Sequence, residues 1–188
     1  MFDDKKIILA SRSPRRQMIL TELGIDFIVK PVDILEEFHN NLPVDEVAQH
    51  VAEQKVKQFP YLKEKELVIA ADTTVIINNT ILGKPSDVDE AKQMLSSLSG
   101  KAHHVTTGVC IKDRHQMHSF SDTTWVQFKT LTDKEIDYYV TNFEPFDKAG
   151  GYGIQEWIGM IGITRIEGSY FTVMGLPIHK VYETLLKF

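Results

Sequence analysis

The chain has 188 residues, of which 43% are hydrophobic, and it carries a formal net charge of −5 at pH 7. This length and apolar content fit one globular domain over residues 1–188, with a core for two or three layers of secondary structure. The negative charge argues against binding of nucleic acid, because nucleic-acid binders usually present a net basic face. Any phosphate-bearing ligand must therefore be held by a local cluster of cations.

The N-terminus and the cysteine content bear on the compartment. The first six residues lack the basic-then-apolar pattern of a secretion signal, and no apolar run approaches the roughly 20 residues of a membrane helix. Cys110 is the only cysteine, which excludes an internal disulfide and a thiolate zinc site. We expect a cytoplasmic protein that binds no membrane, with Cys110 buried.

In the first half of the chain, hydrophobic patterning predicts alternating strands and helices. Ser13 as N-cap and Pro14 at the first helical position begin a helix that Gly24 ends. The polar residues 72–74 interrupt an otherwise apolar strand, and 78–79 supply a turn. The predicted strands are 7–10, 25–31, 67–71 and 75–77, and the predicted helices are 13–24 and 43–59.

The second half continues the alternation. Thr132 and Glu135 form the sequence pattern of a capping box, which begins a helix. Helices are predicted at 86–99, 132–143 and from 177 onward, strands at 104–112, 117–129, 161–166 and 170–173, and a structured loop at 144–155. No internal repeat or low-complexity tract interrupts this order. The pattern favours an α/β fold with a mixed, twisted central sheet flanked by helices.

Residues 11–16, with the sequence SRSPRR, combine two hydroxyls, three guanidinium groups and a predicted helix start. Cations are unfavourable at a helix N-terminus unless an anion balances them, since the helix dipole is positive there. Ser11, Ser13, Arg15 and Arg16 therefore form a candidate phosphate site. A solvated basic helix start explains the segment equally well.

Two residues place charge where the pattern predicts apolar surroundings. Lys55 follows Val51 and Ala48 on the apolar stripe of its helix, so its ammonium group should point into a cleft. Asp72 lies within the apolar strand segments, where a carboxylate is costly unless it is paired, protonated or bound to metal. The alternatives are a lysine that reaches solvent from the edge of the stripe and a structural salt bridge or threonine-capped turn at Asp72.

Three further charged residues lie in predicted loops. Glu36 and Glu37 precede the Lys55 helix and could add a carboxylate for Mg²⁺, which needs few protein ligands when phosphates supply the rest. They could equally be solvated acids. Lys84 lies in the tight loop Gly83-Lys84-Pro85, which alone is weak evidence. The sequence contains no P-loop, dinucleotide-binding or H-E-x-x-H motif.

Taken together, motifs along nearly the whole chain resemble the Maf family of nucleotide pyrophosphatases. They are SRSPRR at 11–16, ADT at 71–73, LSG at 98–100, TGV at 107–109, GKP at 83–85, DKAG at 147–150, YGIQ at 152–155, GSY at 168–170 and GLP at 175–177. The resemblance implies a two-lobed α/β fold of Maf/ITPase type with an active-site cleft between the lobes. It also implies a divalent metal, Mg²⁺ or Mn²⁺, and hydrolysis of nucleoside triphosphates to monophosphates and pyrophosphate.

The resemblance further assigns roles to residues. Arg15, Thr73 and Gln155 match the trio of the branch that prefers dTTP and UTP, and Asp72 matches the proton acceptor. Glu36 matches the loop acid of the family, although the adjacent Glu37 leaves that alignment uncertain by one residue. The expected catalytic residues are Asp72, Glu36, Lys55 and Lys84, the substrate-binding residues are Ser11, Ser13, Arg15, Arg16, Thr73, Lys148 and Gln155, and the metal ligands are Asp72 and Glu36.

Two rival functions are considered. One is a pyrophosphatase for modified purine nucleotides such as 7-methyl-GTP, against which Gln155 weighs, since its amide suits a pyrimidine edge. The other is a nucleotide-sensing regulator of septum formation or division. The sequence departs from many relatives at Glu156-Trp157, where these carry small residues. It leaves open the preferred metal, the choice between normal and damaged pyrimidine nucleotides, and the oligomeric state, including a homodimer.

Overall fold

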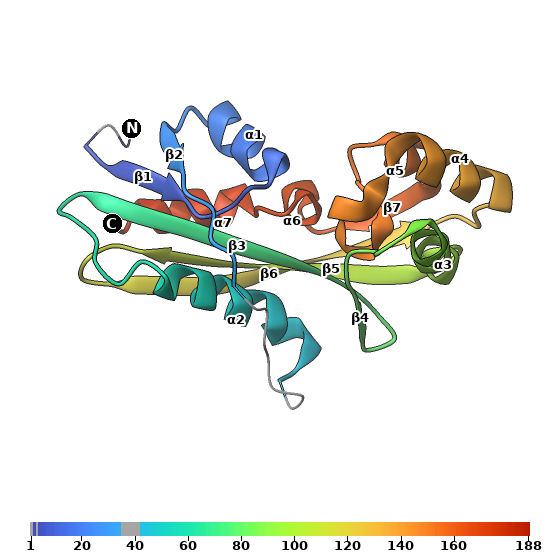
Figure 1. Ribbon diagram of the computed structural model, residues 1–188, viewed down its shortest axis with the longest axis horizontal. Coiled ribbons are helices and arrows are strands. Elements are labelled where there is room, and N and C mark those ends of the chain that lie inside the picture. The colour runs from blue at the N-terminus through green and yellow to red at the C-terminus, as the bar shows by residue number, and fades with distance from the viewer. Residues whose placement is uncertain (1, 3, 35–41) are drawn as a thin grey trace. The chain divides into compact units, whose positions relative to one another are not determined.

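The computed structural model describes residues 2, 4–34 and 42–188, and Figure 1 shows its helices and strands. One seven-stranded sheet has the order β2-β1-β3-β5-β6-β7, and β4 pairs with β3. β1 is parallel to β2 and β3, whereas β4 is antiparallel to β3 and β7 to β6. The expected mixed central sheet with helices is therefore confirmed.

The chain divides into two compact units. Unit 1 comprises Met1–Asp72, Thr107–Asp122 and Gly175–Phe188, and unit 2 comprises Thr73–Thr106 and Thr123–Met174. Strands β3 (Glu66–Ile77), β5 (Ala102–Lys112) and β6 (Met117–Phe128) contribute residues to both units. Two units agree with the expected two lobes, and the cleft expected between them stays a prediction.

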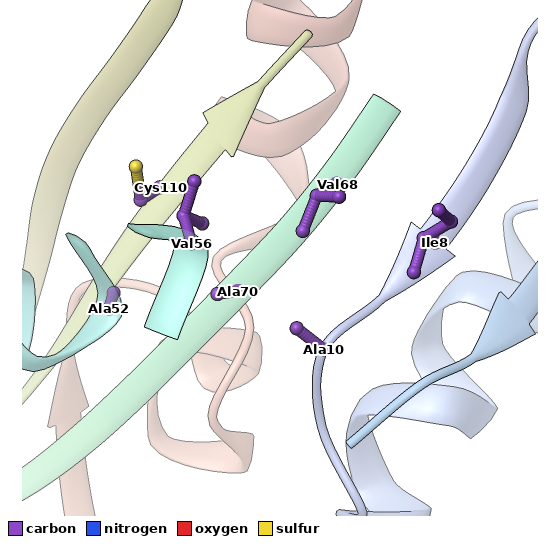
Figure 2. Close-up of a cluster of buried hydrophobic side chains, with 7 residues drawn as sticks. All are labelled: Ile8, Ala10, Ala52, Val56, Val68, Ala70 and Cys110. Atoms are coloured by element: carbon purple, nitrogen blue, oxygen red, sulfur yellow. The ribbon is translucent and has the colours of Figure 1, made fainter. Parts of the chain in front are cut away.

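Unit 1 packs helices on parallel strands. Its complete elements are β1 (Lys6–Leu9), α1 (Pro14–Glu22), β2 (Phe27–Val29), α2 (Val44–Lys57) and α7 (Ile178–Leu185). Seven buried side chains of α2, β5 and the β1 and β3 segments form a core cluster (Figure 2): Ile8, Ala10, Ala52, Val56, Val68, Ala70 and Cys110.

Small residues let α2 approach the sheet within unit 1. A Cβ atom added at Gly108 of β5 would lie 2.1 Å from the backbone nitrogen of Gln49 in α2. Such a distance is far below van der Waals contact, so only glycine fits there. Cys110, two residues along β5, is buried as predicted, and burial raises the pKa of its thiol. Cys110 is thus a core residue.

Unit 2 holds the remaining elements. They are β4 (Thr80–Leu82), α3 (Val88–Leu98), α4 (Asp133–Phe143), α5 (Trp157–Gly162), β7 (Ile163–Glu167), α6 (Tyr170–Met174) and two 3₁₀ turns at Pro145–Asp147 and Ala149–Gly151. Asn78 and Asn79 have positive φ values of 50° and 59°, which forms the predicted turn between β3 and β4.

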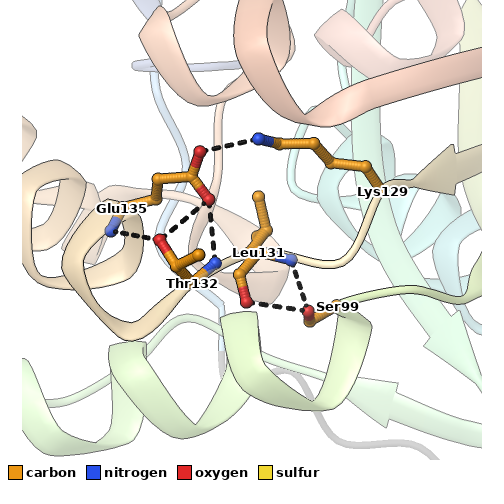
Figure 3. A network of polar contacts seen from close by, with 5 residues as sticks. All are labelled: Ser99, Lys129, Leu131, Thr132 and Glu135. Carbon is orange, nitrogen blue, oxygen red and sulfur yellow. Dashed lines mark hydrogen bonds and ion pairs between the residues drawn. The ribbon is translucent and has the colours of Figure 1, made fainter.

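The predicted capping box at the start of α4 is confirmed (Figure 3). The Thr132 hydroxyl accepts a hydrogen bond from the Glu135 backbone at 3.3 Å, and the Glu135 carboxylate accepts one from the Thr132 backbone at 2.8 Å. Lys129 adds an ion pair to Glu135 at 2.6 Å, and Ser99 accepts a hydrogen bond from the Leu131 backbone at 2.7 Å. These bonds fix the end of α3 against the start of α4.

Two predictions of secondary structure were wrong. The polar residues 72–74 do not interrupt β3, because their backbone stays extended while Asp72 finds a partner on α2. Residues 170–173 form α6 and not a strand, since the Thr124 hydroxyl binds the backbone N–H and C=O of Ser169 and begins a turn there. The strand expected at 161–166 is present as β7 and begins at Ile163, because α5 extends to Gly162. Over the described ranges, no helix is long and apolar enough to cross a membrane.

Candidate functional site

The start of α1 is held by hydroxyl groups, as its sequence predicts. Ser13 is the N-cap, and its Oγ accepts from the Arg16 backbone N–H at 3.5 Å. The buried Ser11 Oγ accepts from the Ser13 N–H at 3.2 Å and from Arg16 Nη1 at 3.1 Å. Arg16 Nε also donates to the Gly175 carbonyl oxygen at 2.7 Å. The serines therefore shape the turn and fix the Arg16 guanidinium group beside it.

The other two arginines of this segment differ from each other. Arg12 makes a bidentate ion pair with Asp33, at 2.7 and 2.8 Å, and both side chains are mostly exposed. Arg12 belongs to the sequence motif but not to the expected substrate-binding residues, and in the structure Asp33 balances its charge. Arg15 lies half-buried in the first turn of α1, where the helix dipole favours an anion.

Lys55 and Asp72 form a largely enclosed ion pair in unit 1. Lys55 Nζ lies 2.7 Å from Asp72 Oδ1, and the two side chains are only 12% and 16% exposed. The cleft that the sequence predicted around the Lys55 ammonium group stays a prediction. The structural salt bridge, which the sequence left open for Asp72, is present. The ion pair by itself therefore does not show whether Asp72 has a structural or a catalytic role.

The register of unit 1 places this ion pair near the start of α1. Leu9 of β1 lies opposite Ile69 of β3 in a parallel pair, and the Ala10 N–H donates to the Ile69 carbonyl at 2.8 Å. Ser11 and Asp72 follow within three residues of these positions. Ser11 lies just after the carboxyl end of β1, and Asp72 lies within β3, past the carboxyl end of the segment that pairs in parallel with β1. Ligands of open α/β sheets bind at such ends. The serine turn and the Lys55–Asp72 pair thus belong to one end of unit 1.

In unit 2, the loop that carries Lys84 contacts the 3₁₀ turn that follows Lys148. The Gly150 N–H donates to the Gly83 carbonyl oxygen at 2.9 Å. Gly150 has φ +68°, and an added Cβ would lie 2.9 Å from Val75 Cγ1, so both conformation and space require glycine. The exposed Lys84 is therefore presented next to the 149–151 turn.

Lys148 is buried and doubly paired. Its Nζ lies 2.6 Å from Asp147 Oδ1 and 3.1 Å from Glu156 Oε1, and its side chain is 9% exposed. The other carboxylate oxygen of Glu156 accepts a hydrogen bond from the Tyr139 hydroxyl. A lysine held by two acids is less suited to a direct phosphate contact than its sequence motif suggested, and its expected substrate role stays a prediction.

Gln155 carries a buried polar atom that no described residue satisfies. Its side chain is half-buried, and its Oε1 atom has no hydrogen-bond partner among the residues that the structure describes. A buried acceptor without a donor costs free energy, so it usually marks a strained or ligand-binding position. Thr73, the first residue of unit 2, is half-buried in β3 directly after Asp72.

The predicted metal site is not tested by the structure. Glu36 and Glu37 lie outside the described residues. Among residues 2, 4–34 and 42–188, no group of three or more His, Cys, Asp and Glu side chains could hold a metal ion. Asp72 supplies a carboxylate, the donor that Mg²⁺ and Mn²⁺ prefer, and Mg²⁺ commonly needs only one or two such ligands beside phosphate oxygens.

Sequence reasoning missed two residues next to Gln155. Tyr139 lies on the apolar stripe of α4, so its sequence position indicates a core aromatic residue and gives no sign that its hydroxyl forms hydrogen bonds. Glu156 was noted only as a departure from the family pattern. An acid beside an expected substrate-binding residue was a usable signal, but its partners Tyr139 and Lys148 follow only from the tertiary structure.

Comparison with known proteins gives consistent matches. Residues 6–188 match the family model described as Maf-like protein. A Porphyromonas gingivalis protein named dTTP/UTP pyrophosphatase is 48% identical over 97% of this chain and 94% of its own length. One of the same name from Christiangramia forsetii is 50% identical over 98% and 95%.

Solved structures of Ham1 proteins are more distant. The Coxiella burnetii protein matches with TM-score 0.45 and 17% identity over 66% of this chain and 73% of its own. The Staphylococcus aureus protein gives TM-score 0.43 and 15% identity over 66% and 72%.

Proposed function

The chain belongs to the Maf family, and from this premise we propose that it hydrolyses dTTP and UTP to the monophosphate and pyrophosphate. The shared name of relatives that are 46–50% identical over nearly the whole chain supports this substrate class. The observation that carries the proposal is the enclosed Lys55–Asp72 pair, in which Asp72 lies just past the last residues paired between the parallel strands β1 and β3, as does the cationic start of α1.

The triphosphate is assigned to cations that differ in how firmly they are held. Arg16 is fixed by Ser11 and the Gly175 carbonyl, so it is preorganised to receive phosphate oxygens. Arg15 adds a second guanidinium group in the same helical turn, and the α1 N-terminus adds its dipole. Lys84 is exposed on its loop and suits the role of a mobile counter-charge. These groups neutralise the charge that builds up during phosphoryl transfer.

Asp72 is assigned as proton acceptor. In the proposed reaction, a water oxygen bonds to the α-phosphorus, the bond from that phosphorus to the bridging oxygen breaks, and pyrophosphate leaves with the electron pair. Asp72 takes the proton of the water. Lys55 holds the carboxylate through Oδ1. A divalent ion, Mg²⁺ or Mn²⁺, held by Asp72 and Glu36, would supply charge neutralisation at the phosphates.

Gln155 is assigned to the base. Uracil and thymine present an N–H donor between two carbonyl acceptors, and an amide can accept from the first and donate to a neighbouring carbonyl. The unsatisfied Oε1 of Gln155 supports this assignment, because an incoming N–H would satisfy it. Thr73 and Arg15 complete the specificity trio of the family branch. The cytoplasmic location and the homodimer stay predictions from the sequence.

A nucleotide panel tests the proposal. Pyrophosphate release would be measured for dTTP, UTP, CTP, ATP and 7-methyl-GTP, each with Mg²⁺, with Mn²⁺ and with a chelator. We expect the highest kcat/KM for dTTP and UTP and loss of activity on chelation. A preference for 7-methyl-GTP would overturn the substrate assignment, and full activity with the chelator would overturn the metal assignment.

A further inference from the structure

The residues around Gln155 form a closed turn. The Glu156 backbone N–H donates to the Gly153 carbonyl oxygen at 3.0 Å, which makes residues 153–156 a β-turn with Gln155 in its third position. The direction of the Gln155 side chain therefore depends on how firmly the two ends of this turn are held.

Tyr139 holds both ends at once. Its hydroxyl accepts a hydrogen bond from the Gly153 backbone N–H at 3.0 Å and donates one to the Glu156 carboxylate. With the backbone bond between Glu156 and Gly153, these contacts close a ring. Burial, and next the bond to Glu156, raise the pKa of the Tyr139 phenol above its ordinary value, so the hydroxyl keeps the proton that it donates.

Lys148 completes the set from the other side. Its Nζ lies 3.1 Å from Glu156 Oε1, while Tyr139 binds Oε2, so both oxygens of this carboxylate have partners inside unit 2. Glu156 is 20% exposed, and Lys148 9%. Partly buried charges with these partners hold one geometry, because losing either partner would leave a charge poorly compensated.

The side chains of Gln155 and Glu156 also share one contact surface. A Cβ added at Gly153 would lie 2.8 Å from Glu156 Cδ and 3.1 Å from Gln155 Nε2. The two side chains thus pack over the same glycine, and a displacement of the Glu156 carboxylate would release the space that confines the Gln155 amide.

We propose that Glu156 is a positioning residue for substrate selection, which acts through Tyr139 and Lys148 to fix the amide of Gln155 toward the base. The inference rests on the proposed function, since it assumes that Gln155 reads the base. Glu156 touches no reacting atom. Its loss should therefore change which base is accepted and leave the chemistry at the phosphate intact.

Selectivity between dTTP and dCTP provides the test, because cytosine reverses the donor and acceptor pattern that the amide would read. Wild type, Glu156→Ala, Glu156→Gln and Tyr139→Phe would be given dTTP and excess dCTP in one mixture, and both monophosphates would be quantified. The product ratio reports the ratio of the two kcat/KM values. That ratio does not depend on the concentration of active enzyme, so partial unfolding of a variant does not affect it.

We expect Glu156→Ala and Tyr139→Phe to lower the dTTP preference about tenfold, as for loss of a hydrogen bond to a charged group. Separate kinetics should show the change mainly as a higher KM for dTTP. Glu156→Gln keeps an acceptor for the Tyr139 hydroxyl and should retain more of the preference than Glu156→Ala. Tyr138→Phe, which removes an exposed hydroxyl from the same helix, is the matched control and should keep the wild-type ratio.

The outcomes separate the two proposals. If wild type releases no pyrophosphate from dTTP, the proposed function fails. If wild type prefers dTTP and the Glu156→Ala and Tyr139→Phe variants keep that preference, the proposed function stands and the positioning role of Glu156 is overturned. Equal loss of turnover for both nucleotides would also overturn it, since that result indicates a purely structural role.

Discussion

An enclosed lysine–carboxylate pair is present in each unit, and the two pairs differ in how the carboxylate is held. Within the part of the chain that the structure describes, Asp72 is held by Lys55 at one oxygen, Oδ1, across two elements, α2 and β3. Glu156 has Lys148 on one oxygen and Tyr139 on the other. Exposure does not separate them, because Asp72 is 16% and Glu156 20% exposed.

The difference suggests a division of work. A carboxylate engaged at both oxygens is suited to fixing a turn and unsuited to taking a proton from water. A carboxylate held at one oxygen keeps its orientation and can still serve as an acceptor. Similar burial and similar charge can therefore mark a reacting group in one unit and a supporting group in the other, and substitutions should separate the two.

The largest expected effect comes from Asp72→Asn. The amide keeps the shape and can still accept from Lys55, but it cannot take a proton, so kcat for dTTP should fall about a thousandfold. Pyrophosphate release at saturating metal measures this. Asp33→Asn removes the same charge from an exposed pair and should retain wild-type kcat. Near-normal turnover by Asp72→Asn would contradict its assignment as proton acceptor.

Lys148→Met should act on stability. It leaves the Glu156 carboxylate without its cation, and we expect the free energy of unfolding to fall by about 2–3 kcal/mol, measured by urea denaturation. Lys92→Met is the matched control, since its pair with Asp137 is 37% and 57% exposed and should contribute much less to stability. Equal losses of unfolding free energy for both variants would show that the Lys148 ion pairs stabilise the fold no more than an exposed ion pair does.

His103 gives unit 2 a dependence on pH. Burial, and next the charge of His104, lower the pKa of His103 to about 4 from its ordinary value of 6.5. The unfolded chain therefore binds a proton that the folded chain rejects between these pH values. The folded state is therefore favoured most above pH 6.5, and the free energy of unfolding should fall by about 2 kcal/mol between pH 7 and pH 4.5.

Denaturation at pH 7, 5.5 and 4.5 would measure this loss. His103→Phe should flatten the pH dependence, because a phenyl ring cannot be protonated and can still stack on Phe128. Exposed His115→Gln should leave the wild-type slope. An unchanged slope in the His103 variant would assign the pH dependence to other groups.

The features that the sequence predicted best are those that depend on residues close together in the chain. Ser13 and Thr132 were recognised as N-caps, because a cap needs only a hydroxyl and a backbone N–H three residues later. The segment 170–173 was mistaken for a strand, because its aromatic and β-branched residues favour strands and the contacts of Ser169 that begin α6 come from distant Thr124.

The same distinction between local and long-range contacts applies to the candidate site. Lys55 and Asp72 were each recognised from a charge within an apolar pattern, and the ion pair that joins them required the packing of α2 on β3. The ion pair of Arg12 with Asp33, 21 residues later in the chain, could not be predicted from the sequence motif that contains Arg12. Tyr139 and Glu156, 17 residues apart, meet only through tertiary structure.

Ser13→Ala should have the smallest effect, and it tests whether the α1 start serves the fold or the ligand. Loss of the cap, in which Ser13 Oγ accepts from the Arg16 N–H at 3.5 Å, should cost about 1 kcal/mol of unfolding free energy.

The control is Thr21→Ala, which removes another hydroxyl of α1. This hydroxyl donates to the Gln17 carbonyl, and its loss should cost less because helical carbonyls already have partners. If Ser13 only shapes the turn, its loss affects phosphate binding only through the displaced Arg16. The KM for dTTP should then rise about threefold at most. A much larger rise in KM with an unchanged free energy of unfolding would instead indicate that the Ser13 hydroxyl binds the phosphate directly. The α1 start would then be a preformed anion site, and the hydrogen bonds within the turn would not be its main purpose.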